Sequence, residues 1–144
     1  MNDEQPVFGD IEPDRQYERR PSAYAVVTND DERIAVVRTP RGYYLPGGGL
    51  KKGEDAEIAL MRECLEECGF RPERLSYFAS AVQLLCAPGE GWFRIEGRFY
   101  SAHLANAYRV SIQDGFEWMT PFEACRLLTR PFERWAIEVW MRQS

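Results

Sequence analysis

The pattern of hydrophobic and polar residues predicts an amphipathic helix near the middle of the chain, over residues 55–68. This segment contains neither proline nor glycine and is rich in strong helix formers, and Gly69 directly after it is a typical helix stop. Residues spaced by three and four lie on the same face of a helix. We therefore expect a core face made of Leu60, Met61, Cys64, Leu65 and Cys68.

Short runs rich in β-branched and aromatic residues predict strands on both sides of this helix. Asn29 and Asp30 separate the first two runs and indicate a hairpin. Pro88–Gly91 predicts the turn between two longer strands, and Gly97 indicates a bulge in the second of them. The expected strands are Ala23–Thr28, Arg33–Arg38, Tyr43–Leu45, Leu75–Cys86, Phe93–Leu104 and Phe116–Met119.

Two helices are expected near the end of the chain, and each begins at a proline. Thr120 is a good capping residue before Pro121, so a helix is predicted over Pro121–Leu128. Pro131 opens a final helix that carries Trp135 and further apolar residues. Strands and helices mixed in this way indicate an α/β fold.

Length and composition indicate one folded domain. The chain has 144 residues, of which 44% are hydrophobic and 13% aromatic, enough for a sizeable core. Residues 1–20 are polar and contain proline, so we expect an irregular N-terminal lead-in, with Phe8 and Tyr17 attaching it to the body. Residues 21–144 are expected to form a single domain.

Net charge and hydropathy exclude several function classes. The formal charge of −5 argues against a general nucleic-acid binder, which depends on basic residues. No apolar run approaches the roughly 20 residues that span a bilayer, and the first residues lack the pattern of a signal peptide. We expect a cytoplasmic protein with no membrane partner.

The cysteines do not form a recognisable metal or disulfide pattern. The four cysteines include no CxxC pair, and His103 is the only histidine. Cys64 and Cys68 lie one turn apart on the core face of the predicted helix, so buried free thiols are expected. His103 lies within an alternating run and is interpreted as a strand residue.

The polar face of the predicted central helix carries three glutamates, Glu63, Glu66 and Glu67, spaced at i, i+3 and i+4. Like charges at this spacing repel one another, so a nearby cation would stabilise them. Grouped carboxylates suit Mg²⁺ or Mn²⁺. Pro46–Gly49 is expected to form a glycine-rich loop with a tight turn before the helix, and its bare backbone can approach a ligand closely. Composition alone equally permits a plain solvated face.

The segment Gly48–Phe70 resembles the Nudix box, whose pattern is Gx5Ex7REUxEExGU, where U is a bulky apolar residue. Cys64 departs from it, standing where the family usually has a larger aliphatic residue. The resemblance implies a Nudix-type α/β/α sandwich with a mixed, partly antiparallel sheet. The matching residues are Gly48, Glu54, Arg62, Glu63, Glu66, Glu67, Gly69 and Phe70.

The resemblance implies a metal-dependent hydrolase that cleaves a diphosphate linkage in a nucleoside diphosphate derivative by attack of water on phosphorus. Bound metal would polarise the phosphoryl group and activate the water. By the same resemblance, the metal ligands are Glu63, Glu66 and Glu67, with the carbonyl of Gly48 as a fourth, and the cofactor is Mg²⁺ or Mn²⁺.

Two further sets of residues are assigned supporting roles. Arg62 and Glu54 are expected to form a pair that orients the glycine segment on the helix, the alternative being an ordinary surface salt bridge. The segment Gly47–Gly49 is expected to bind substrate. Arg38 and Arg41 flank this segment and could contact substrate phosphates, or could be plain surface arginines.

The catalytic base and the substrate are less constrained. Asp114 and Glu117 are candidates for the base, and both could equally be ordinary turn and strand residues. A small-molecule nucleotide is expected, as a nucleoside di- or triphosphate or a dinucleoside polyphosphate. Alternatives are a nucleotide-sensing module that does not cleave, and an isoprenyl diphosphate isomerase for which Cys86 is the available cysteine. Dimers are common in the family, so a homodimer is one expectation.

Overall fold

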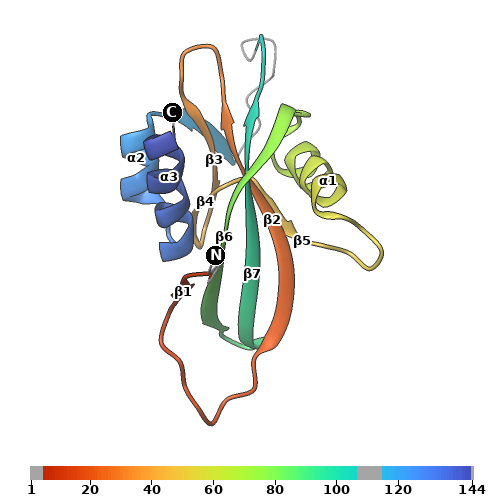
Figure 1. Cartoon of the computed structure of the whole chain (residues 1–144), viewed down its shortest axis with the longest axis vertical. Helices are drawn as coiled ribbons and strands as arrows, with labels where there is room; N and C mark the ends of the chain where they lie inside the picture. Colours follow the sequence, from red (N-terminus) through yellow and green to blue (C-terminus); the bar gives the residue numbers. More distant parts are fainter. Residues whose placement is uncertain (1–4, 107–114, 144) are drawn as a thin grey trace.

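The computed structural model describes residues 5–106 and 115–143, and within them the chain forms eight strands and three helices (Figure 1). In chain order the elements are β1 (Val7–Phe8), β2 (Glu18–Thr28), β3 (Ile34–Thr39), β4 (Gly42–Tyr44), β5 (Gly47–Gly49), α1 (Ala56–Cys68), β6 (Glu73–Ala87), β7 (Gly91–His103), β8 (Phe116–Met119), α2 (Pro121–Leu127) and α3 (Pro131–Gln143).

One mixed sheet forms the centre of the molecule. Its strand order is β1-β6-β7-β2-β3-β4, with β5 paired to β2 and β8 paired to β3. The strands β2 and β7 run parallel from Glu18↔Phe93 to Thr28↔His103, whereas β6 and β7 are antiparallel. Figure 1 shows α1 on one side of the sheet and α2 with α3 on the other. The predicted α/β/α sandwich with a mixed, partly antiparallel sheet is confirmed.

Alternation along β2 divides the core into two parts. Tyr24 and Val26 point to the side covered by α2 and α3, where they pack with Phe99. Ala23 and Ala25 point to the opposite side and pack against α1. Successive residues of a strand face opposite sides of a sheet, so one strand supplies both cores.

The boundaries of α1 follow the predicted signals. Asp55 caps the helix by accepting a hydrogen bond from the Ile58 amide at 2.9 Å, and Gly69 ends it with a left-handed φ of 75°. One core assignment was wrong, because Leu65 is 43% exposed. The helix contacts the sheet through Leu60, Cys64 and Cys68, which are spaced by four. Leu65 lies about 100° around the helix from Cys64 and therefore points away from this contact.

The glycine segment forms a strand instead of the loop that we expected. Gly47 pairs with Tyr24, and Gly49 pairs with Ser22. Gly47 has a φ of 143°, and a Cβ atom on it would lie 2.1 Å from the carbonyl oxygen of Ala23. Only glycine permits this close pairing, so the segment is laid tightly against β2.

The start of β2 and the regularity of β7 also differ from expectation. The strand β2 begins at Glu18, because its polar first residues pair with β7. Gly97 is not a bulge, since it pairs in register with Ala81 and Ser22. Its lack of a side chain instead admits the ring of Phe132, whose Cε2 would lie 2.8 Å from a Cβ at this position.

The remaining structural expectations concern attachments and thiols. Phe8 lies 6.0 Å from Trp135 between ring centroids, and Tyr17 lies 6.0 Å from Trp92, as expected for a lead-in held to the body. All four cysteines are free thiols, and His103 ends β7. Of the helices described, none has the length and apolar character needed to cross a membrane.

Candidate active site

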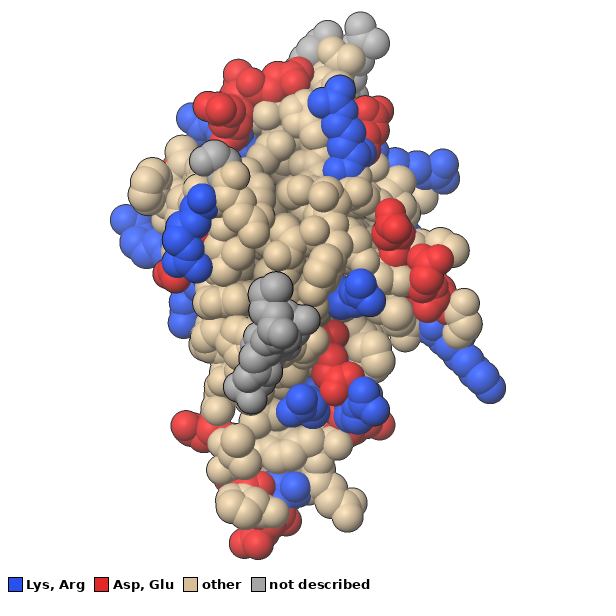
Figure 2. Space-filling view, in the orientation of Figure 1, with Lys and Arg blue, Asp and Glu red and all other residues tan. Residues whose placement is uncertain are grey.

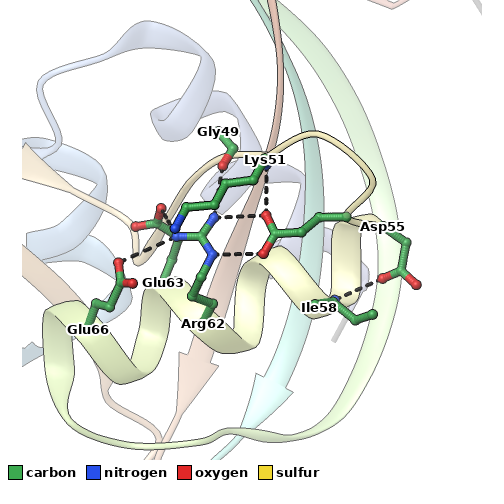
Figure 3. Close-up of polar contacts among 8 residues, drawn as sticks. Gly49, Lys51, Asp55, Ile58, Arg62, Glu63 and Glu66 are labelled. Carbon is green, nitrogen blue, oxygen red and sulfur yellow. Dashed lines mark hydrogen bonds and ion pairs between the residues drawn. The ribbon is translucent and has the colours of Figure 1, made fainter.

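Arg62 joins α1 to the segment that precedes it (Figure 3). Its Nε and Nη2 donate to the two carboxylate oxygens of Glu54 at 2.8 and 2.9 Å, and Nη2 also donates to the carbonyl of Gly49 at 3.2 Å. Glu54 accepts a further bond from the Lys51 amide at 2.7 Å. Hydrogen bonds from Arg62 and then Lys51 lower the pKa of Glu54 to about 2. The predicted bidentate pair is therefore formed, and it ties the glycine segment to the helix.

The same guanidinium reaches two glutamates of the helix, the adjacent Glu63 and Glu66 one turn further on. Arg62 Nη1 donates to Glu63 at 2.9 Å and to the more exposed Glu66 at 3.4 Å, and Figure 3 shows both carboxylates turned toward it. Gly48 lies beside Glu63, since a Cβ on this glycine would be 3.0 Å from the carboxylate carbon. Glycine thus keeps a space free beside the Glu63 carboxylate.

Glu67 is part-buried and, unlike Glu63 and Glu66, is held by a backbone amide. Its Oε1 accepts a hydrogen bond from the Gly47 amide at 2.9 Å. Burial of the carboxyl group raises the pKa of Glu67 to about 8, although the Gly47 bond acts in the opposite direction. Glu67 also lines a cavity, so it connects the helix to the space where a ligand could lie.

Within residues 5–106 and 115–143, no group of three or more His, Cys, Asp or Glu side chains is gathered as a metal site. Arg62 holds Glu63 and Glu66, and Gly47 holds Glu67, so the glutamates share a helix but do not converge on one point. The donor set nevertheless fits a hard divalent cation. Carboxylates on adjacent turns are suitable ligands, and Gly48 leaves the adjoining space open.

A cavity of about 510 Å³ opens beside the glycine segment, between the sheet and the start of α3. Its walls include Gly47–Gly49 and Arg41, which the sequence analysis assigned to substrate binding. They also include Glu67, which was assigned to the metal and not to a cavity wall. Apolar side chains contribute to the same walls. They are Tyr24, Val37, Leu45 and Ile95.

Other predicted residues lie away from this cavity. Arg38 does not belong to its lining and instead pairs with Glu117 of β8 at 3.9 Å. The candidate base Glu117 is thus placed with an exposed arginine and outside the cavity walls. Asp114, the other candidate, lies outside the described residues. Arg41, in contrast, belongs to the cavity lining and also lies 3.9 Å from the Glu90 carboxylate.

Two arginines of the cavity lining were not anticipated. Arg130 lies over the ring of Tyr44, 5.0 Å from its centroid, and Arg20 lies over Phe93 at 3.9 Å. Pro131 predicts the start of α3 from the sequence, so the position of Arg130 directly before a helix could have been predicted. That this helix end would face the glycine segment depended on tertiary packing.

Glu133 of α3 was also missed. The side chain is fully buried, and its Oε1 accepts the hydrogen bond donated by the Leu45 amide. Among residues 5–106 and 115–143, its Oε2 has no hydrogen-bond partner. Burial raises the pKa of Glu133 to about 7. An acidic residue in the first turn of a helix is common because it interacts favourably with the helix dipole. Its presence there therefore gave no sign in the sequence that Glu133 is buried.

Comparisons with known proteins bear on the identity of this site. A curated RNA pyrophosphohydrolase of Psychromonas ingrahamii is 30% identical over 64 residues, which cover 43% of this chain and about a third (35%) of the relative's own length. Solved structures share the fold at low identity. An Ap4A hydrolase of C. elegans superposes with a TM-score of 0.68 at 18% identity, covering 87% of this chain and 98% of that one.

Two further structures agree. A dihydroneopterin triphosphate pyrophosphohydrolase of E. coli has a TM-score of 0.68 at 19% identity, covering 89% of this chain and 99% of that one. A MutT protein of Bacillus halodurans has a TM-score of 0.66 at 17% identity, covering 83% and 80%. The family model of the NUDIX domain matches residues 18–138, which include the box and the whole sheet from β2 onward. This chain belongs to the Nudix family.

Proposed function

We propose that this chain is a metal-dependent hydrolase that cleaves a diphosphate linkage in a nucleoside diphosphate derivative by attack of water on phosphorus. The observation that carries the proposal is that Glu67 and Gly47–Gly49 form one side of the 510 Å³ cavity. A nucleotide in this cavity would bring its phosphates to the carboxylates of α1. The similar proteins include pyrophosphohydrolases and an Ap4A hydrolase, which supports the reaction class.

The proposed metal ligands are Glu63, Glu66 and Glu67, together with the carbonyl of Gly48, and the proposed ion is Mg²⁺ or Mn²⁺. When bound, such an ion polarises a phosphoryl group and lowers the pKa of a coordinated water. Arg62 and Glu54 would hold the helix and the glycine segment in register, which keeps Gly48 beside Glu63.

Substrate is proposed to bind through the cavity walls. The backbone of Gly47–Gly49 can approach phosphates closely, and Arg41 at the rim can meet their charge. Arg130 and Tyr44 provide a cation and an aromatic ring for the nucleoside portion. Arg38 is not proposed as a substrate contact, since it lies outside the cavity lining.

The proposed substrate is a small nucleotide, as a nucleoside di- or triphosphate or a dinucleoside polyphosphate. The cavity volume of about 510 Å³ is in the range of small-molecule sites. On the face that Figure 2 shows, the described Lys and Arg side chains alternate with Asp and Glu, and the whole chain has a charge of −5. These features favour a small nucleotide over a long nucleic acid.

The test is hydrolysis of a panel of nucleoside triphosphates, dinucleoside polyphosphates and an RNA with a 5′-triphosphate, each with Mg²⁺, Mn²⁺ or excess chelator. The nucleotide, pyrophosphate and phosphate products are separated and quantified by anion-exchange chromatography. Wild type is compared with Glu67→Gln and with Glu57→Gln, a matched control in the exposed first turn of α1. We expect turnover that requires metal, falls at least about 100-fold in Glu67→Gln and is retained in Glu57→Gln.

The opposite results are equally informative. Metal-independent turnover, or equal turnover in both variants, would refute the proposed site. Metal-dependent nucleotide binding without turnover on any substrate would indicate a sensor in place of an enzyme. Turnover confined to the RNA substrate would overturn the proposed substrate class while leaving the reaction in place.

A further inference from the structure

The segment that joins β4 to β5 is held by carboxyl groups from both helical layers. Glu67 of α1 accepts the Gly47 amide at 2.9 Å, and Glu133 of α3 accepts the Leu45 amide. Pro46 lies between these two donors and has no amide hydrogen of its own. Because α1 and α3 cover opposite faces of the sheet, the segment is fixed from two sides (Figure 1).

Glu133 is unusual among the residues around it. Its neighbours along the core face of α3, Phe132, Ala136 and Ile137, are buried apolar residues, and Glu133 is buried as completely as they are. A buried carboxyl group needs hydrogen bonds to offset lost hydration, yet Oε2 finds no partner in the part of the chain that the structure describes. An apolar side chain would suit this position better if packing were its only role. The hydrogen bond to Leu45 is the specific contact that a carboxyl adds.

That contact acts on a segment that forms part of the candidate site. The Leu45 side chain lines the cavity, and Gly47–Gly49 form the wall next to Glu67. Gly48 lies against the Glu63 carboxylate. A displacement of Leu45 would therefore move the cavity wall and the glycines together, and displacements of about 1 Å in a reacting geometry can reduce rates by about 100-fold.

We propose that Glu133 is a positioning residue, whose carboxyl group fixes Leu45–Gly49 relative to Glu63 and Glu67 and thereby sets the turnover number, without touching substrate or metal. This inference rests on the proposed hydrolase function. Glu133 reaches the site from the layer opposite the Nudix box, 66 residues beyond Glu67 in the sequence.

The experiment compares three variants of the full chain. Glu133→Met removes the acceptor at similar length, and Glu133→Gln keeps an oxygen for the Leu45 amide. Gln83→Met is the matched control, because buried Gln83 accepts the Phe132 amide at 3.1 Å at the same end of α3 and donates to the Leu84 carbonyl. Each variant is measured for kcat and KM on the substrate found in the panel, for thermal unfolding, and for amide hydrogen exchange at Leu45 and Gly47.

We expect Glu133→Met to lower kcat by at least about 10-fold with KM changed less than about 3-fold, and to accelerate exchange at Leu45 and Gly47. Glu133→Gln should retain kcat within about 3-fold. Gln83→Met should lower the unfolding temperature while kcat of the folded protein is retained. If Glu133→Met does not fold, Glu133→Asp replaces it, since this change withdraws the acceptor by about one C–C bond.

Two results would overturn the inference. One is wild-type kcat and exchange in folded Glu133→Met or Glu133→Asp. The other is an equal loss of kcat in Gln83→Met, which would indicate a purely structural effect. If the wild type shows no turnover, the proposed function fails by itself, and the exchange rates at Leu45 and Gly47 still decide whether Glu133 fixes the segment.

Discussion

The helices α1 and α3 flank the same sheet and have 13 residues each, but Glu54 just before α1 and Glu133 in α3 are held in opposite ways. On the α1 side, Glu54 is paired with Arg62, and these hydrogen bonds lower its pKa to about 2. On the α3 side, Glu133 is buried, one of its oxygens has no partner among the described residues, and burial raises its pKa to about 7. Pairing with Arg62 stabilises the charge of Glu54, whereas burial disfavours the charge of Glu133, as it also does for Glu67 of α1.

This difference indicates how the site is divided between the layers. The α1 layer supplies a charged set suited to metal and phosphate, connected to the glycine segment by Arg62. The α3 layer holds the same segment through the hydrogen bond from the Leu45 amide to Glu133. Arg130, directly before α3, lines the cavity. Variants in each layer, and at Gly47 where β5 pairs with β2, test whether both contributions are needed.

The largest expected effect is at this pairing, in Gly47→Ala. The new Cβ would lie 2.1 Å from the Ala23 carbonyl oxygen at a φ of 143°, so β5 must leave β2. We expect a loss of about 4 kcal/mol in the free energy of unfolding, measured by urea denaturation. Gly53→Ala is the control, because at a φ of 84° the new Cβ would meet no atom of the described residues within 4 Å and the change should cost only about 1 kcal/mol. Equal losses would show that close pairing of Gly47 is unimportant.

The next effect concerns Glu133→Gln and pH. Below pH 4.5, the ordinary value for Glu, the carboxyl is protonated in both folded and unfolded chains. Between pH 4.5 and about 7 only the unfolded chain ionises, so wild-type stability falls as pH rises. Relative to wild type, Glu133→Gln should gain on the order of 3 kcal/mol across this window. Urea denaturation at several pH values measures the difference, and a constant difference would contradict the buried state of Glu133.

A smaller effect is expected on catalysis when Arg62 is replaced by lysine. A lysine ammonium cannot make the two parallel hydrogen bonds that Arg62 makes to Glu54. Nor can it bridge Glu54, Gly49 and Glu63 as the guanidinium does. We expect kcat/KM to fall by 10- to 100-fold, as for other residues that orient ligands. Arg98→Lys, which lies over the Tyr77 ring instead, is the control in the same assay. Unchanged kcat/KM in Arg62→Lys would reduce the pair to a surface salt bridge.

The smallest effect is predicted for Leu65→Gln on the outer side of α1. Leu65 is 43% exposed, so its replacement should change the free energy of unfolding by less than about 0.5 kcal/mol. Leu60→Ala on the inner side, where exposure is zero, should cost about 2–5 kcal/mol. Thermal unfolding of the two variants compares them directly. A large loss for Leu65→Gln would place a contact on the outer side of this helix.

Much of the fold and part of the candidate site could be predicted from local patterns. The capping residues of α1, the proline starts of α2 and α3 and the β2–β3 hairpin all depend on contacts between near neighbours in the chain. The Arg62–Glu54 pair is of the same kind, because one helix and the turn before it contain both residues. The spacing of the box residues on a helix determines which side chains share a face.

Only the tertiary structure decided the contacts between distant segments. Three of these contacts join segments far apart in the sequence: the parallel pairing of β2 with β7, the packing of Phe132 on Gly97, and the hydrogen bond from Leu45 to Glu133. The strand formed by Gly47–Gly49 depends on how closely two backbones approach. Periodicity shows which face of an element is apolar, but not which other element covers that face. The sequence by itself therefore determined the chemistry of the α1 layer, whereas packing of α3 against the sheet decided the cavity and the hydrogen bond from Leu45 to Glu133.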